Sequence, residues 1–166
     1  MDRMDTTPDA QDHAEIAALI SGFFRALDER RFEEGWADAY FTDDLHVTSP
    51  VGEATGTEAI RLAEESVGRF AATLHTSSDV LIHTTPDAHT ADVTWNAHMT
   101  HVHRDSTLFT VGGVYEARFR RTEGDGGSAG WGCGRCGPRG SRPGGKPVTP
   151  VLVSKDIDRR CPPLTE

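Results

Sequence analysis

The spacing of the apolar residues changes near Phe70, and this change limits the folds that the chain can adopt. Before it, apolar side chains recur at the spacing of a helix face, as in the stripe Ile16, Leu19, Ile20, Phe23 and Phe24. After it come three long segments rich in β-branched and aromatic residues, separated by the turn signals "TPDAH" and "RDST". Helices followed by a run of antiparallel strands predict an α+β fold.

We expect three helices ahead of this sheet. The first begins at Asp12, which forms a capping-box pattern with Glu15. A second, short one is predicted in "FEEGWADAYF", and a third in "TEAIRLAEESVGRF", after a short strand at residues 45–49. The strand segments are residues 73–85, 90–104 and 108–121. Residues 12–123 therefore form the predicted domain, preceded by a flexible N-terminus over residues 1–11.

The alternation within the strands assigns side chains to faces. In the middle strand Trp95 and Met99 share one side with His101 and His103, and His98 points to the other. The first set is the more apolar, so it is predicted to face the helices. The same reasoning turns Tyr115 of the next strand inward.

Charge and hydropathy exclude two classes of partner. The net charge is −9, and residues 124–166 hold more basic than acidic side chains, so the excess of acid lies before them. A body this acidic repels phosphate backbones, which excludes nucleic-acid binding. No apolar run is long enough to span a membrane. The start "MDRMDTTPDAQD" lacks the pattern of a secretory signal, so we expect a cytoplasmic protein.

The composition changes abruptly after Gly124. The stretch "GDGGSAGWGCGRCGPRGSRPGGKP" holds more than half of the chain's 17 glycines and has no periodicity, so it is not expected to form a central strand. Residues 124–166 are predicted to be a disordered or loosely attached tail. An alternative reading is a change of reading frame near Trp131. All three cysteines lie here, but "CGRC" alone lacks the four ligands of a structural zinc site.

The histidines of "WNAHMTHVHRD" allow two kinds of chemistry. His101 and His103 could face one metal ion, as the HxH of a cupin does. Such a site also needs a carboxylate and a further histidine, and the following residues offer only Asp105. The preceding helices also argue against a cupin, so we predict no metal and no cofactor.

Acid–base catalysis is the preferred interpretation, because a histidine in an apolar pocket can transfer protons near neutral pH. His75 lies early in the preceding strand segment and comes within reach of His101 if the strands pair antiparallel. Asp28 continues the row Ile20, Phe24 at intervals of four. The alternative is that all three are ordinary polar residues. Predicted substrate contacts are Phe24, Tyr40, Trp95, Met99, His103 and Tyr115.

The segments "FFRALDERRFEEGWADAYFTDDLHVTSPVGEATGTEAI", "LHTSSDV", "VTWNAHMTHVH" and "VGGVYEARFRR" resemble the SnoaL-like group of the nuclear-transport-factor-2-like superfamily over residues 12–123. The resemblance implies a cone, in which helices close over a strongly curved, mostly antiparallel sheet around an apolar pocket. It also implies a homodimer formed through the sheet. Asp28, His75 and His101 are similar to the aspartate and two histidines of scytalone dehydratase, although Leu27 stands where that enzyme has a tyrosine.

The expected function is a cofactor-independent cyclase, dehydratase or isomerase that acts on a hydrophobic, polyketide-like or polycyclic small molecule. In this hypothesis His101 acts as general acid or base, Asp28 orients a histidine, and His75 supplies the other proton or binds a substrate oxygen. Tyr115 donates to the developing oxyanion. The competing hypothesis is a ligand-binding or dimerisation module of the same fold without catalysis, because a fold alone does not determine function.

Overall fold

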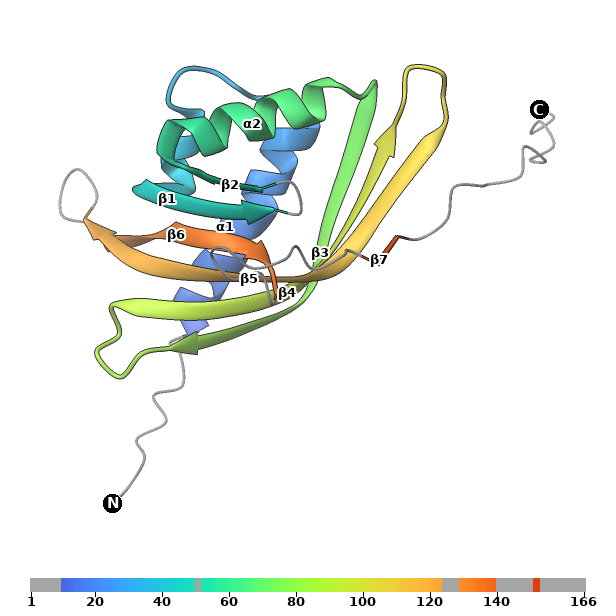
Figure 1. The fold of residues 1–166 in the computed structure, drawn as a ribbon. Helices are drawn as coiled ribbons and strands as arrows, with labels where there is room; N and C mark the ends of the chain where they lie inside the picture. The colour runs from blue at the N-terminus through green and yellow to red at the C-terminus, as the bar shows by residue number, and fades with distance from the viewer. Residues whose placement is uncertain (1–9, 50–51, 124–128, 140–150, 153–166) are drawn as a thin grey trace, which may run out of the picture.

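The computed structural model describes residues 10–49, 52–123, 129–139 and 151–152. The long strands curve around two α-helices that lie on one side of the sheet (Figure 1). The elements, in chain order, are α1 Ala10–Asp28, the 3-10 turn η1 Trp36–Ala39, β1 Phe41–Ser49, β2 Gly52–Thr55, α2 Gly56–Gly68, β3 Ala72–Thr84, β4 Thr90–Val102, β5 Leu108–Glu123, β6 Ala129–Pro138 and β7 Val151–Leu152.

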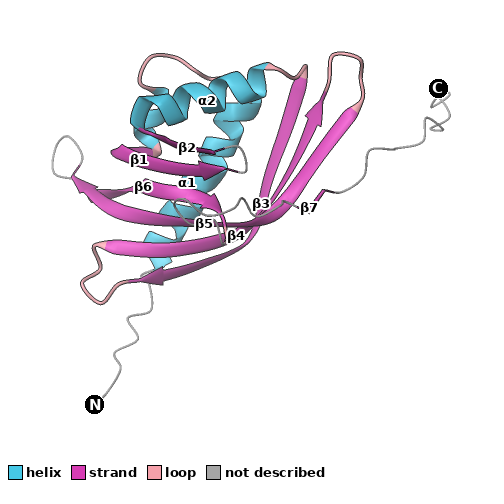
Figure 2. Cartoon of the chain, in the orientation of Figure 1, coloured by secondary structure: helices cyan, strands magenta, loops and turns pink. Residues whose placement is uncertain are grey.

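A single sheet of seven strands contains all of the strands above, in the order β2-β1-β6-β5-β4-β3, with the short β7 beside β5 (Figure 2). Only β1 and β6 pair in parallel. The other pairs are antiparallel. The predicted α+β class with a mostly antiparallel sheet is therefore confirmed.

The core lies between α1 and the inner face of the sheet. Ile16, Ile20 and Phe24 supply the helix side, one residue from each successive turn. The strand side follows the predicted alternation, since every second residue of β4 from Ala91 to Ala97 is buried and those between are not. The predicted inward direction of Val93, Trp95 and Ala97 in β4 is therefore confirmed.

The prediction of three helices is wrong, because only α1 and α2 are α-helical among the described residues. The segment "FEEGWADAYF" instead makes the single 3-10 turn η1. Gly35 precedes it with a φ of 75°, a left-handed conformation that an α-helix does not continue through. The aromatic residues still pack, as the ring of Trp36 stacks on Phe23 of α1 with centroids 6.1 Å apart.

Asp12 has a different role from the predicted helix cap. Helix α1 already includes Ala10, so Asp12 lies within its first turn. The residue is buried. Arg121 of β5 donates from Nη2 to Oδ1 of Asp12 over 2.5 Å, and the indole of Trp131 donates to the same oxygen over 3.2 Å. Asp12 therefore ties the start of α1 to two strands, a contact that local spacing could not reveal.

The expectation that the glycine-rich stretch forms no central strand is wrong for β6. This strand lies between β1 and β5 and pairs with both. Glycine lowers the stability of a strand but keeps both its backbone N–H and C=O, so β6 can still bond to a neighbour on each side. Trp131 and Cys133 then bury their side chains in the core. Residues 124–128, 140–150 and 153–166 of the predicted tail lie outside the described residues, as do residues 1–9 of the predicted flexible N-terminus.

Gly137 shows why β6 needs small residues. A Cβ atom added there would lie 2.6 Å from the backbone oxygen of Thr48 in β1. We predict that Gly137→Ala lowers the free energy of unfolding by about 1–3 kcal/mol, as overpacking does. The measurement is the midpoint of urea denaturation. Gly113→Ala is the matched control, because a Cβ there meets nothing within 4 Å, and equal effects of the two changes would contradict the prediction.

Candidate active site

A cavity of about 250 Å³ lies between the helices and the inner face of the sheet. Its wall is mostly apolar and carries a small number of polar groups, which is the usual composition of a small-molecule site. The predicted site residues that belong to this wall are Phe24, Tyr40, His75, Trp95, Met99, His101 and Tyr115.

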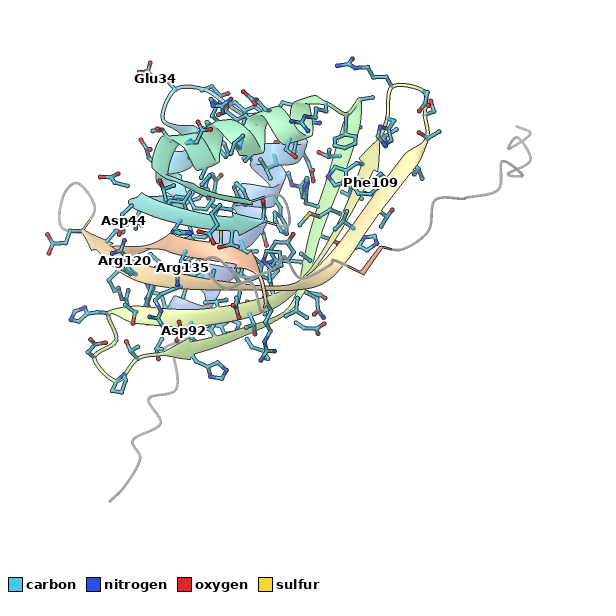
Figure 3. The ribbon with its side chains drawn as sticks, viewed as in Figure 1. Glu34, Asp44, Asp92, Phe109, Arg120 and Arg135 are labelled. Carbon is cyan, nitrogen blue, oxygen red and sulfur yellow. The ribbon has the colours of Figure 1, made fainter. Side chains whose placement is uncertain are left out.

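A larger hollow of about 570 Å³ lies against the outer face of the sheet. Its charged residues include Asp44, Arg120 and Arg135, which Figure 3 shows grouped over β1, β5 and β6. Arg120 bonds to Asp44, and Arg118 forms two bonds to Asp92. Since Arg118 and Arg120 are already paired with carboxylates on exposed strands, we take the outer hollow as a solvated surface and the inner cavity as the candidate site.

Asp28 and His75 form a hydrogen-bonded pair, in which His75 belongs to the cavity wall and Asp28 lies behind it, outside the lining residues. Asp28 is the last residue of α1, and its Oδ1 lies 2.6 Å from Nδ1 of His75. Its Oδ2 accepts the backbone N–H of His75 over 2.9 Å, and the Thr73 hydroxyl donates to Oδ1 over 2.9 Å. The side chains of His75 and Asp28 are 4% and 15% exposed. A carboxylate accepts hydrogen bonds, so Nδ1 of His75 carries the hydrogen and Nε2 is the nitrogen left for a ligand.

His101 stands beside this pair on the neighbouring strand. Antiparallel pairing places His75 opposite Met99 and Thr73 opposite His101. The two imidazole rings meet edge to face with centroids 5.6 Å apart. Nδ1 of His101 lies 3.3 Å from the carbonyl oxygen of Phe109, which is labelled in Figure 3. That carbonyl can only accept, so Nδ1 carries the hydrogen here too.

Burial lowers the pKa of His101 below its ordinary value of 6.5. The nearby His75 lowers this pKa further, against weaker opposing effects of the Phe109 carbonyl and of Asp28. His101 is only 7% exposed. Because burial removes water from the ring, the charged imidazolium is disfavoured. His101 is therefore neutral at physiological pH and presents Nε2 as a hydrogen-bond acceptor.

This lowered pKa predicts a pH dependence of stability. The folded protein binds the His101 proton less readily than the unfolded chain does, so stability falls as the pH drops through 6.5. We expect His101→Gln to lose less stability than the wild type between about pH 7.5 and about pH 5.5. Thermal unfolding at several pH values checks this. His98→Gln, at an exposed position of β4, should keep the wild-type slope, and equal slopes for all three proteins would refute the prediction.

His103 is placed differently from the other predicted residues. It is exposed, lies outside the cavity wall, and packs its ring against Phe70 with centroids 5.0 Å apart. The described residues contain no group of three or more His, Cys, Asp or Glu side chains arranged to hold a metal ion. Both His101 and His103 pack against Phe70, but only His101 belongs to the cavity wall.

Two further aromatic residues of the wall carry a polar group, the phenol of Tyr115 and the indole N–H of Trp95. Burial raises the pKa of Tyr115, with a smaller contribution from Cys136, so its phenol stays protonated at neutral pH. The indole of Trp95 stacks on Tyr115 with centroids 5.9 Å apart. The Trp95 Nε1 atom is buried and has no hydrogen-bond partner among the described residues.

Sequence reasoning missed several residues around the site. Thr73 was not singled out, although it donates directly to Asp28. Arg30 was not singled out either, although its Nη1 donates to the Thr73 hydroxyl over 2.8 Å. Cys133 and Cys136 of β6 also belong to the cavity wall. No local pattern marks these residues, because their role depends on strand pairing.

Solved structures share this fold at low sequence identity. A proposed scytalone dehydratase from Novosphingobium aromaticivorans is 20% identical, with a TM-score of 0.68 and coverage of 94% of this chain and 95% of that one. A hexachlorocyclohexane dehydrochlorinase, LinA type 3, from Novosphingobium barchaimii is 18% identical, with a TM-score of 0.63 and coverage of 89% and 95%. A nuclear-transport-factor-2-like superfamily protein from Salmonella enterica is 16% identical, with a TM-score of 0.63 and coverage of 89% and 99%.

Protein-family models give a more direct assignment. No curated protein matches the chain. The model of the SnoaL-like domain matches residues 8–132, which is most of the chain and includes every residue of the Asp28, His75 and His101 cluster. No helix among the described residues is long and apolar enough to cross a membrane. The chain belongs to the SnoaL-like family, and it shares the fold of the nuclear-transport-factor-2-like superfamily protein from Salmonella.

Proposed function

We propose that this protein is an enzyme that transfers protons on a hydrophobic small molecule, in a dehydration, cyclisation or isomerisation. The observation that carries the proposal is the 2.6 Å contact between Asp28 Oδ1 and His75 Nδ1 at the wall of an apolar cavity. A base held in one tautomer by a buried carboxylate is a recurrent arrangement for proton abstraction.

The contacts suggest a role for each group. His75 takes a proton from a substrate carbon through Nε2, and Asp28 stabilises the imidazolium that forms. His75 then returns this proton to another carbon in an isomerisation or cyclisation, or to a leaving hydroxyl that departs as water in a dehydration. Neutral His101 accepts a hydrogen bond from a substrate hydroxyl. Tyr115 donates to the oxygen on which negative charge develops. These roles differ from the prediction, in which His101 and not His75 was the main acid–base group.

The volume of the cavity limits the size of the substrate. Its volume of about 250 Å³ exceeds the ~150 Å³ that encloses a benzene molecule in an engineered cavity. It lies below the ~300 Å³ at which pockets for drug-sized ligands begin. A molecule of one or two rings therefore suits it better than a larger polycycle.

Two of the similar structures bear names consistent with this chemistry. One is a proposed dehydratase and the other a dehydrochlorinase, and both names describe the removal of a small group from a carbon skeleton. A polyketide-like substrate of secondary metabolism and a homodimer complete the proposal, on the resemblance given above. We also propose a cytoplasmic location.

Hydrogen–deuterium exchange tests the proposal without knowledge of the natural substrate. One- and two-ring ketones and β-hydroxyketones are incubated with the protein in D₂O, and loss of the proton next to the carbonyl is followed by NMR. The proposal predicts that the protein accelerates exchange, or elimination of water, for members of this panel. Binding of panel members without any acceleration would instead support a non-catalytic ligand-binding module.

A further inference from the structure

Helix α1 ends in a Schellman motif with an arginine where glycine is usual. The backbone N–H of Arg31 donates to the carbonyl of Ala26 over 3.0 Å, and that of Arg30 donates to the carbonyl of Leu27 over 3.3 Å. These two bonds define the motif, and Arg30 occupies its left-handed position with a φ of 54°. A non-glycine residue here is strained, and such strain is often retained at functional sites.

The Arg30 side chain turns back over the candidate site. Nη1 donates to the Thr73 hydroxyl over 2.8 Å and to the carbonyl of Leu27 over 2.5 Å. Nη2 donates to the carbonyl of Val67 over 2.9 Å. One guanidinium therefore joins the ends of α1 and α2 to β3, directly beside Asp28.

The contact with Thr73 determines the direction of a hydroxyl group. A threonine hydroxyl has one hydrogen to donate, and it accepts through its lone pairs. Since Arg30 occupies the oxygen as a donor, the Thr73 hydrogen goes to Oδ1 of Asp28, 2.9 Å away. The same Oδ1 receives Nδ1–H of His75, while Oδ2 receives the His75 backbone N–H. The carboxylate is thus held by three donors that have fixed directions.

We propose that Arg30 is a positioning residue for the Asp28–His75 pair. Through Thr73 it holds the carboxylate in the orientation that keeps the hydrogen of His75 on Nδ1 and leaves Nε2 free to accept a proton. The inference deepens the proposed function, on which its catalytic meaning rests.

The need to pair buried carbonyls does not account for the side chain. The carbonyl of Leu27 already accepts the backbone N–H of Arg30, and that of Val67 accepts the N–H of Phe70. Neither carbonyl needs the guanidinium to be paired. Glycine would also satisfy the backbone conformation better than arginine does. What the arginine adds is its bond to Thr73.

The test is the tautomer of His75 in the ligand-free protein, read from imidazole ¹⁵N chemical shifts at alkaline pH, where imidazole rings are neutral. The wild type should show hydrogen on Nδ1. Arg30→Gly should shift His75 toward the Nε2–H tautomer, and the glycine should keep the thermal midpoint close to that of the wild type because it suits the backbone. Thr73→Val should have the same effect on the tautomer, whereas Thr73→Ser, which keeps the hydroxyl, should retain the wild-type signal.

An unchanged His75 tautomer in Arg30→Gly would overturn the inference, as would an equal shift in Thr73→Ser and Thr73→Val. Both results leave the proposed function intact, because they need no substrate. Conversely, a protein that shows the predicted tautomers but accelerates no exchange on the ketone panel would retain the positioning role and lose the enzymatic one.

Discussion

Asp28→Asn is expected to reduce the rate of proton abstraction by about 10⁴-fold, the loss seen when a catalytic histidine is given the wrong tautomer. An asparagine can turn its NH₂ group toward Nδ1 of His75, which stabilises hydrogen on Nε2 instead. Nε2 is the atom that must accept the substrate proton, so the base is blocked while the cavity keeps its shape. The measurement is the deuterium exchange rate of whichever ketone the wild type processes fastest. His75→Gln removes the base itself and should lose at least as much.

The matched controls lie on the outer face of the sheet. Asp92→Asn makes the same chemical change at an exposed carboxylate that pairs with Arg118, and His98→Gln removes an exposed histidine of β4. Neither should alter the exchange rate by more than a small factor. If Asp28→Asn catalyses deuterium exchange at the wild-type rate, the Asp28–His75 pair has only a structural role. That result would support the non-catalytic hypothesis. Ligand binding by Asp28→Asn, measured by calorimetry, should persist in either case.

Truncation after Glu123 is expected to abolish cooperative thermal unfolding. It removes β6 from between β1 and β5, along with the buried side chains of Trp131 and Cys133. It also takes away the indole that donates to the buried Asp12. Loss of one large aromatic side chain from a core typically costs about 3–5 kcal/mol, and an entire domain is stable by only about 5–15 kcal/mol. Circular dichroism against temperature gives the answer.

A truncation after Arg139 is the control, because it keeps the whole of β6 and should melt cooperatively. If the protein that ends at Glu123 melts like the full chain, β6 contributes nothing to stability and the tail is dispensable, as its composition predicts.

A change of reading frame near Trp131 is a separate proposal for this part of the sequence. The family match ends at residue 132, next to that point, and resequencing the gene through codon 131 tests it directly.

Much of the fold could be predicted because it depends on local spacing. The alternation of β4 placed Trp95 and His101 on one face and His98 on the other, and burial follows that division. The sequence of β3 gives no clear apolar face, and the structure shows the physical reason. Its pairing with β4 shifts between Ser78 and Leu81, around Asp79 with a φ of 52°. Such a bulge exchanges the faces, so no single alternation describes the whole strand.

The composition of the tail was misleading because glycine has a low strand propensity, yet its backbone can still form the hydrogen bonds of a sheet. A stretch such as "GWGCGRCG" lacks the side chains that mark a strand, and nothing local shows that β1 and β5 leave a gap between them. At Gly137 a small residue is required, because a Cβ atom there would lie 2.6 Å from the backbone oxygen of Thr48.

The sequence by itself determined which residues could form the site: spacing put Asp28 at the end of the apolar stripe of α1, and alternation put His101 on the inner face. Only the tertiary structure decided that Asp28 bonds to His75, that His103 lies outside the cavity, and that Arg30 reaches Thr73. Helical and strand periods are local, and they fix the direction of a side chain within its own element. A hydrogen bond needs atoms from distant elements to meet within about 3 Å, which depends on strand register and on how the helices pack.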